Sequence, residues 1–169
     1  YLEELYEKAA PDTVSLCYPY AFNDGKIEEQ LSYTITEAYN YCISRQCKSL
    51  SSRARKFFSG PCMKLIPMSF IQGRRFDVRF KNGEDSLYMF LISDKIHKLS
   101  FTSRHAIYYR RFRENSATTT KHAWGYMLKN GWLMACSYTL IFFAKPFDYS
   151  FILYVVRLLG VLKTIIVRA

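Results

Sequence analysis

The sequence contains none of the short motifs that mark the common classes of enzyme. It has no GxSxG nucleophile elbow, no HExxH zinc motif, no phosphate-binding loop and no GxGxxG dinucleotide fingerprint. Its three histidines are His97, His105 and His122, and their spacing matches no common metal site. We therefore expect a protein that is not an enzyme and that uses no metal or other cofactor.

Cysteines are few and irregularly spaced. There are five, an odd number, and no two of them form a C-x-x-C pair of the kind found in zinc sites and thioredoxin-like proteins. Cys42 and Cys47 are five residues apart, so on one helix their side chains would point in different directions. The pattern predicts structural thiols in a reducing compartment.

Acidic residues become rare after residue 44. Residues 1–44 hold eight acidic and two basic side chains, whereas residues 45–129 hold 18 basic and five acidic ones, and the whole chain has a net charge of +10. A basic surface of this kind suits RNA, anionic lipid or an acidic protein face, and it is also compatible with a solvated surface that has no dedicated partner.

The remaining composition is that of a folded chain with a large partner. Half of the 169 residues are hydrophobic, which is enough for one packed domain, and 17% are aromatic. Aromatic side chains at this density are typical of cores, interfaces and membrane boundaries. The sequence starts at Tyr1 without an initiator methionine, so we expect either a processed organellar protein or a fragment.

The first of three predicted regions, residues 1–62, is helical and changes from acidic to basic. A short helix is expected over residues 1–10, followed over 11–25 by a loop or a short extended segment that contains two prolines and an Asn-Asp-Gly cluster. A second helix is predicted over residues 26–44, because apolar side chains recur there every three or four positions. Gly60-Pro61 ends the basic run that follows.

The second region, residues 63–125, is predicted to hold a small antiparallel sheet. Apolar and polar side chains alternate over residues 75–81, and Asn82-Gly83 is a strong signal for a type I′ turn, so a hairpin is expected with Val78 opposite Leu87 and Phe76 opposite Met89. A third strand runs through Leu99 and Phe101. Residues 105–115 form a fourth strand or the start of a helix. Together with the N-terminal helices packed on the sheet, this predicts an α+β fold.

The segment IYYRRFR combines aromatic rings with arginines. Such a mixture suits single-stranded nucleic acid, on which rings stack and guanidinium groups meet phosphates, and it suits a lipid headgroup boundary equally well. An amphipathic element that buries its rings is a third interpretation. No RNA-recognition motif is present, so the RNA interpretation rests on charge. The candidate contacts to lipid or another polyanion are Arg104, Tyr108, Tyr109, Arg110, Arg111 and Arg113.

The third region, residues 126–169, is strongly apolar. Residues 131–144 carry no charge, and after the sequence KPFD a second apolar stretch runs from residue 149 to 167, interrupted by Arg157 and Lys163. A helix of 19 residues rises about 28 Å, close to the thickness of a hydrocarbon core. The region is expected to form a helical segment or hairpin that enters the membrane or is buried in protein. Two strands are the alternative. Arg157 and Lys163 are the candidate intramembrane or interface residues.

These patterns together favour a non-catalytic accessory subunit with a structural role. The expected setting is a large organellar membrane complex, such as a mitochondrial respiratory or ATP synthase assembly at the inner membrane, with other protein subunits and membrane lipid as partners. The alternative is a basic, RNA-contacting structural protein of a mitochondrial ribosome in the matrix. An independent binding module fits less well, because the apolar tail would then lack a partner.

Overall fold

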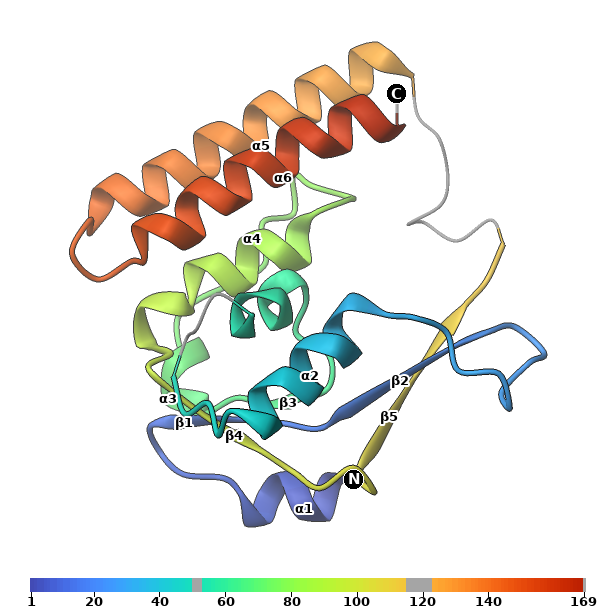
Figure 1. Ribbon diagram of the computed structural model, residues 1–169. Helices are drawn as coiled ribbons and strands as arrows, with labels where there is room; N and C mark the ends of the chain where they lie inside the picture. Colours follow the sequence, from blue (N-terminus) through green and yellow to red (C-terminus); the bar gives the residue numbers. More distant parts are fainter. Residues whose placement is uncertain (50–52, 115–122, 169) are drawn as a thin grey trace. The chain divides into compact units, whose positions relative to one another are not determined.

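The computed structural model describes residues 1–49, 53–114 and 123–168, and it is of the α+β type (Figure 1). The chain forms two compact units. Unit 1 consists of Tyr1–Gly73 and Lys95–Glu114, and unit 2 consists of Arg74–Asp94 and Asn115–Ala169. Each unit is described separately below.

Unit 1 is built on two pairs of parallel strands. Strand β1 (Thr13–Leu16) pairs with β4 (Lys98–Phe101), and β2 (Tyr18–Asn23) pairs with β5 (Ile107–Phe112), in both cases in parallel. The short strand β3 (Lys64–Leu65) adds an antiparallel edge to β1. Because β1 and β2 are separated only by Cys17, one continuous extended stretch runs beside a second one that lies more than 80 residues later in the chain.

Three helical segments and one further short helix complete unit 1. Helix α1 (Leu2–Glu7) buries Leu5, and α2 (Thr34–Ser44) buries one side against the strands. The Thr36 hydroxyl donates to the Pro19 carbonyl at 2.6 Å, and the Tyr39 hydroxyl donates to the Thr102 carbonyl at 2.5 Å. The 3₁₀ helix η1 (Ala54–Ser59) adds two buried phenylalanines, and α3 (Met68–Ile71) is a single turn. The core of unit 1 is therefore rich in aromatic rings.

Unit 2 is helical. Its elements are α4 (Glu84–Leu91), α5 (Trp124–Ala144) and α6 (Phe151–Arg168), and the 3₁₀ turn η2 (Ser93–Lys95) lies at the junction with unit 1. Helices α5 and α6 form an antiparallel hairpin joined by a tight turn over residues 145–150 (Figure 1). Of the two alternatives for the third region, helices are therefore correct, and the KPFD sequence is the turn between them.

The predictions for the N-terminal half were right in part. Of the two alternatives for residues 11–25, the extended segment is correct, since β1 and β2 lie there, although their partners far along the chain are shown by no local pattern. The predicted helix over 26–44 begins only at Thr34, since the preceding segment is tied to β2 through a hydrogen bond from the Leu31 amide to the Ala21 carbonyl at 2.8 Å. The helix over the first residues, the stop at Gly60-Pro61 and the strands at 98–101 and 107–112 are confirmed.

The hairpin around Asn82-Gly83 is also wrong, and with it the antiparallel sheet. Gly83 does adopt the left-handed conformation (φ +91°), but it precedes the first turn of helix α4 instead of joining two strands. Glu84 and Asp85 lie in that first turn, where negative charge is favourable. The helix buries Leu87 and Phe90 on its inner side, a gain that an exposed two-stranded ribbon would not provide.

Within the described ranges, no helix combines the length and the apolar character needed to cross a membrane, in contrast to the span expected over residues 149–167.

Candidate interface on the helical hairpin

The two helices of the hairpin meet along a tightly packed seam. Gly131 makes a close approach possible, because a Cβ atom at this position would lie 2.5 Å from the Ile165 side chain. Nearer the turn, the rings of Phe142 and Tyr154 stack at 4.5 Å between centroids with an angle of 9° between their planes. The Thr139 and Tyr154 hydroxyls are 3.0 Å apart and form a hydrogen bond. The seam therefore fixes how the two helices lie against each other.

The inner side of the hairpin packs on α4 through aromatic rings. Tyr138 is 1% exposed, lies edge-on to Phe90 at 5.2 Å and shares a hydrogen bond of 2.8 Å with the Ser86 hydroxyl. Tyr149 stacks on Phe90 and donates to the Leu91 carbonyl at 2.9 Å. Burial raises the pKa of Tyr149 to about 12, so this hydroxyl remains a donor at physiological pH.

A buried ion pair lies close to this cluster. The Arg74 guanidinium binds the Asp94 carboxylate through both terminal nitrogens, with 2.7 Å between Nη2 and Oδ2, and it also donates to the Leu91 carbonyl at 2.6 Å. Asp94 is buried, and its hydrogen bonds are the main reason that the pKa of Arg74 is raised. The arginine, the aspartate and Tyr149 thus connect the start and the end of the 74–94 segment to the hairpin.

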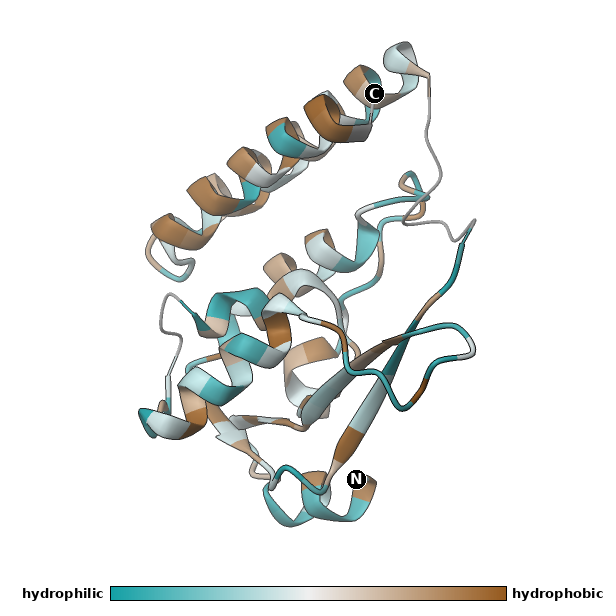
Figure 2. Ribbon diagram, turned by 45° about the vertical axis from the view of Figure 1, so that its right-hand side comes forward, coloured by the Kyte–Doolittle hydropathy of each residue, from teal (hydrophilic) through white to brown (hydrophobic). Residues whose placement is uncertain are grey.

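The outer side of the hairpin is apolar and exposed. Figure 2 shows that hydrophobic residues make up much of both helices. On α5 the exposed residues Leu128, Trp132 and Leu140 are spaced so that they share one side of the helix, and on α6 the same holds for Ile152, Val156 and Leu159. We call the whole set the hairpin surface. It comprises Leu128, Trp132, Leu140, Phe143, Phe147, Phe151, Ile152, Val156, Leu159, Leu162 and Ile166.

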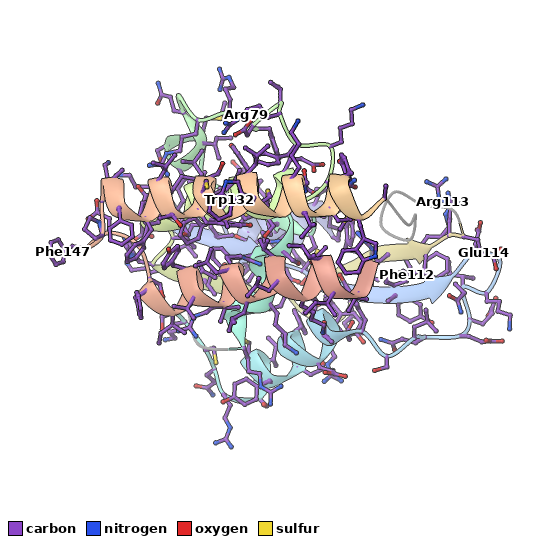
Figure 3. The ribbon with its side chains drawn as sticks, turned by 90° about the horizontal axis from the view of Figure 1, so that it is seen from above. Arg79, Phe112, Arg113, Glu114, Trp132 and Phe147 are labelled. Atoms are coloured by element: carbon purple, nitrogen blue, oxygen red, sulfur yellow. The ribbon has the colours of Figure 1, made fainter. Side chains whose placement is uncertain are left out.

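Two members of the hairpin surface are visible in Figure 3, which looks onto the two helices. Trp132 lies on α5 and is 72% exposed, and Phe147 projects from the turn and is fully exposed. Scattered exposed apolar residues are normal on a protein, but a continuous set on two adjacent helices marks an interaction surface. The hairpin surface is therefore the candidate functional site.

Charge on the hairpin is sparse and mostly positive. Lys129, Lys145 and Lys163 are exposed, and Asp148 in the turn is the acidic residue between residues 123 and 168. Lys163 follows Leu159 by four positions and precedes Ile166 by three, so it belongs to the same side of α6 as these apolar residues. Lys163, for which an intramembrane or interface role is predicted, therefore lies beside the hairpin surface.

Arg157 lies on the opposite side of α6. Its guanidinium is largely buried, and its Nε and Nη2 atoms have no hydrogen-bond partner among the residues that the structure describes. Burial lowers the pKa of Arg157, an effect that the nearby Tyr138 partly opposes. Buried donors without acceptors destabilise a folded chain. The described residues offer no acceptor for these two Arg157 nitrogens, so the cost of burying them is not offset there.

The basic aromatic segment belongs to unit 1 and forms strand β5. Tyr109 is 53% exposed, although its ring touches those of Tyr20 and Phe22 edge-on. Arg111 is exposed and lies 3.6 Å from the Asp24 carboxylate, and Arg113 follows on the same side of the strand. These three are the members of the predicted set that point together to solvent.

The other members of that set are engaged within unit 1. The Arg110 guanidinium stacks on the Phe112 ring at 5.4 Å. Tyr108 is hydrogen-bonded to Cys62, and this contact together with burial raises the pKa of Tyr108 to about 12. Arg104 lies before the strand and donates to the Asn40 side chain at 2.8 Å. The segment is thus mainly an amphipathic strand, in which the Tyr108 and Phe112 rings are half-buried and the Tyr109 ring is exposed.

A cleft of about 320 Å³ lies beside the hairpin and is lined by Arg75, Arg79 and Ser137 among others. Its basic residues suggest an anion site at first sight. Arg79, however, already makes an ion pair with Asp77 at 2.6 Å, so the positive charge there is largely neutralised. The cleft is a weaker candidate than the hairpin surface.

The hairpin surface was only partly anticipated from the sequence. The sequence shows that residues 131–167 are mostly apolar. Apolar residues also recur at every second position from Trp132 through Met134 to Cys136, a pattern that is typical of a strand, so helix and strand were both possible. The spacing of Leu128, Trp132 and Leu140, four and then eight residues, was the signal for a helix with an apolar outer side.

Among known proteins, no family model matches the chain, and no curated protein or solved structure is significantly similar to it.

Proposed function

We propose that this protein is a non-catalytic accessory subunit that has a structural role in a large hetero-oligomeric complex of an organellar membrane. A mitochondrial respiratory or ATP synthase assembly at the inner membrane is the setting that fits best. Its partners are other protein subunits and membrane lipid. The observation that carries this proposal is the hairpin surface, because eleven apolar residues on one hairpin are exposed in the part of the chain that the structure describes, and such a set marks an interaction surface.

Arg157 supports the same proposal independently. Two buried nitrogens of its guanidinium have no acceptor among the described residues, and burial lowers its pKa, so the isolated chain carries a cost at this position. In the proposed complex, the packing around Arg157 changes on assembly so that these nitrogens gain an acceptor.

The test is native electrophoresis of mitochondria dissolved in mild detergent. The full-length tagged protein is expected to migrate with a large complex. Leu159→Glu combined with Leu162→Glu should shift it to low mass, because a hairpin with two carboxylates in its apolar surface is not held at the membrane where the complex assembles. Ile43→Glu, at an exposed apolar position of α2, is the control and should not shift it. A wild-type protein that migrates at its own mass of about 20 kDa would overturn the proposal.

A second candidate function is supported by Tyr109, Arg111 and Arg113, which are exposed on one side of β5. In this version the protein is a basic structural component of a mitochondrial ribosome and contacts RNA through that strand. Ribonuclease treatment or raised salt would then release it from a fast-sedimenting particle, because phosphate contacts weaken steeply with ionic strength. Retention after both treatments would exclude RNA as the contact that holds it.

A further inference from the structure

We infer that the hairpin surface docks flat on an anionic lipid surface, with α5 and α6 lying in the plane of the headgroups. This inference rests on the proposed function and deepens it, since it names what covers the apolar side of the hairpin. Amphipathic helices bind in this way by placing their apolar side at the boundary between headgroups and acyl chains.

The first argument is the kind of side chain that is exposed. Trp132, Phe143 and Phe147 are among the most exposed members of the hairpin surface, and Phe151 begins α6 just beyond the turn. The Trp132 ring has an apolar body and an N–H donor, which suits a membrane interface, and Phe side chains are common on the apolar side of helices that lie in that interface. Branched aliphatic residues of α6 fill the remainder of the surface.

The second argument is charge complementarity. The exposed charges of the hairpin are Lys129, Lys145 and Lys163 against Asp148 alone. Each lysine can lay its aliphatic stem along the apolar surface and direct its ammonium group to a lipid phosphate. Each basic residue near an anionic membrane strengthens binding severalfold. A membrane therefore satisfies the apolar residues and the lysines at the same time.

The same charges argue against two other occupants. A second copy of this chain would bring the lysines of both hairpins together, and like charges across an apolar contact are unfavourable. A partner protein would need carboxylates placed opposite three lysines at the margins of an apolar patch, a requirement that a fluid anionic bilayer meets without fixed geometry. Lipid is therefore the occupant that the residues favour.

The test uses the full-length protein and vesicles in flotation. One set of vesicles is phosphatidylcholine alone, and the other contains about 30 mol% phosphatidylglycerol, enough for a strongly negative surface. The protein is expected to float with the anionic vesicles and much less with the neutral ones. The chain has two tryptophans, both in α5, so Trp124→Phe leaves Trp132 as the sole reporter. Its emission should shift to shorter wavelength and be quenched by brominated lipid.

Matched variants separate the apolar and the charge contributions. Phe147→Ser should weaken binding roughly fivefold through lost apolar contact, whereas Val78→Ser, at a residue of unit 2 that is 94% exposed but lies outside the hairpin, should not. Lys129→Glu with Lys163→Glu should weaken binding to anionic vesicles about tenfold or more. Lys8→Glu with Lys95→Glu changes the net charge equally at exposed positions of unit 1 and should have a smaller effect.

The outcomes are distinct from those of the native electrophoresis. Failure to float with either kind of vesicle, or equal weakening by the hairpin variants and their controls, would overturn lipid docking. If the protein then still migrates with a large complex in detergent, the accessory-subunit function stands and a protein subunit covers the hairpin surface. If it floats but migrates alone, lipid docking stands and the proposed function fails.

Discussion

Helices α2 and α6 bury similar apolar stripes but differ in what they expose on the opposite side. The outer side of α2 carries Glu37 and Ser44, and its exposed Tyr41 ring is covered in part by the Arg53 guanidinium at 5.5 Å. The outer side of α6 continues with Ile152, Val156 and Leu159. The first helix is complete when its unit folds, whereas the second has a further surface to bury. This difference places the interaction site on the hairpin.

Two part-buried arginines of unit 2, Arg74 and Arg157, differ in the same way: one has its partners within the unit and the other, within the part of the chain that the structure describes, lacks them for part of its guanidinium. Arg74 has the Asp94 carboxylate and the Leu91 carbonyl as acceptors, all within the unit. Arg157 has no partner for two of its nitrogens among the described residues. We therefore expect opposite effects on the stability of the isolated protein. Loss of the Asp94 carboxylate should lower it, whereas loss of the Arg157 guanidinium should leave it unchanged or raise it.

The largest effect is expected from Asp94→Asn. The substitution keeps the shape of the side chain but leaves the Arg74 charge buried without its carboxylate, which typically destabilises a fold by about 3 kcal/mol or more. Urea unfolding followed by tryptophan fluorescence reports on unit 2, because both tryptophans lie in α5. We expect the free energy of unfolding to fall by that amount.

Asp77→Asn is the matched control for this prediction. Asp77 also pairs with an arginine of unit 2, but Arg79 is exposed, and surface ion pairs contribute about 1 kcal/mol or less. If both variants lose the same stability, the burial of the Arg74 pair has no special role, and the contrast with Arg157 would lose its basis.

A smaller effect of opposite sign is expected from Arg157→Leu. The variant removes an unpaired buried charge and substitutes an apolar side chain, so the isolated protein should be unchanged or more stable by about 1 kcal/mol. In native electrophoresis the same variant should migrate less completely with its complex, because the acceptor that the Arg157 nitrogens gain on assembly then has no donor. A variant that is destabilised and assembles normally would show that Arg157 is satisfied within the chain.

Sequence patterns predicted the elements whose signals are local. The apolar spacing at the start of the chain, the alternation around Leu99 and the long apolar stretches around KPFD gave α1, β4 and the hairpin. For residues 11–25 a short extended segment was one of two alternatives, but the pairing of β1 and β2 in sheets was not predicted, because their partners lie far along the chain and Pro19 argues against a strand. Pro19 is tolerated since β2 has β5 as its neighbour on one side and presents an edge on the other.

The Asn82-Gly83 pair shows how a correct local inference gave a wrong element. The sequence correctly predicted a residue with positive φ at Gly83. It did not determine whether strands or a helix follow, since alternation and helical spacing are both present in the next eight residues. Burial of Leu87 and Phe90 against the rest of unit 2 decides for the helix. The same dependence on tertiary burial explains why the sequence could not show that two nitrogens of Arg157 lack partners among the described residues.

The smallest expected effects are on the reactivity of two cysteine thiols, one in the core of unit 1 and one on the hairpin. Cys17 is fully buried and its pKa is raised to about 11 by burial, whereas Cys136 is half-buried on the outer side of α5. At about pH 8, iodoacetamide should modify Cys136 well before Cys17, because the thiolate is the reacting form. Anionic vesicles should then slow the modification of Cys136 while leaving Cys17 unchanged.

The raised pKa of Cys17 also makes the free energy of unfolding depend on pH. A thiol whose pKa is higher in the folded state than its ordinary value of 9.0 stabilises the fold fully below that value and loses the contribution as the pH rises towards about 11. The free energy of unfolding, measured with urea across this range, should fall less steeply in Cys17→Ala than in the wild type. Cys136→Ala, which leaves Cys17 in place, is the control and should keep the wild-type slope. Equal slopes in all three proteins would mean that the core of unit 1 admits water around Cys17, and the contrast between a closed unit 1 and an uncovered hairpin would then be weaker than the packing indicates.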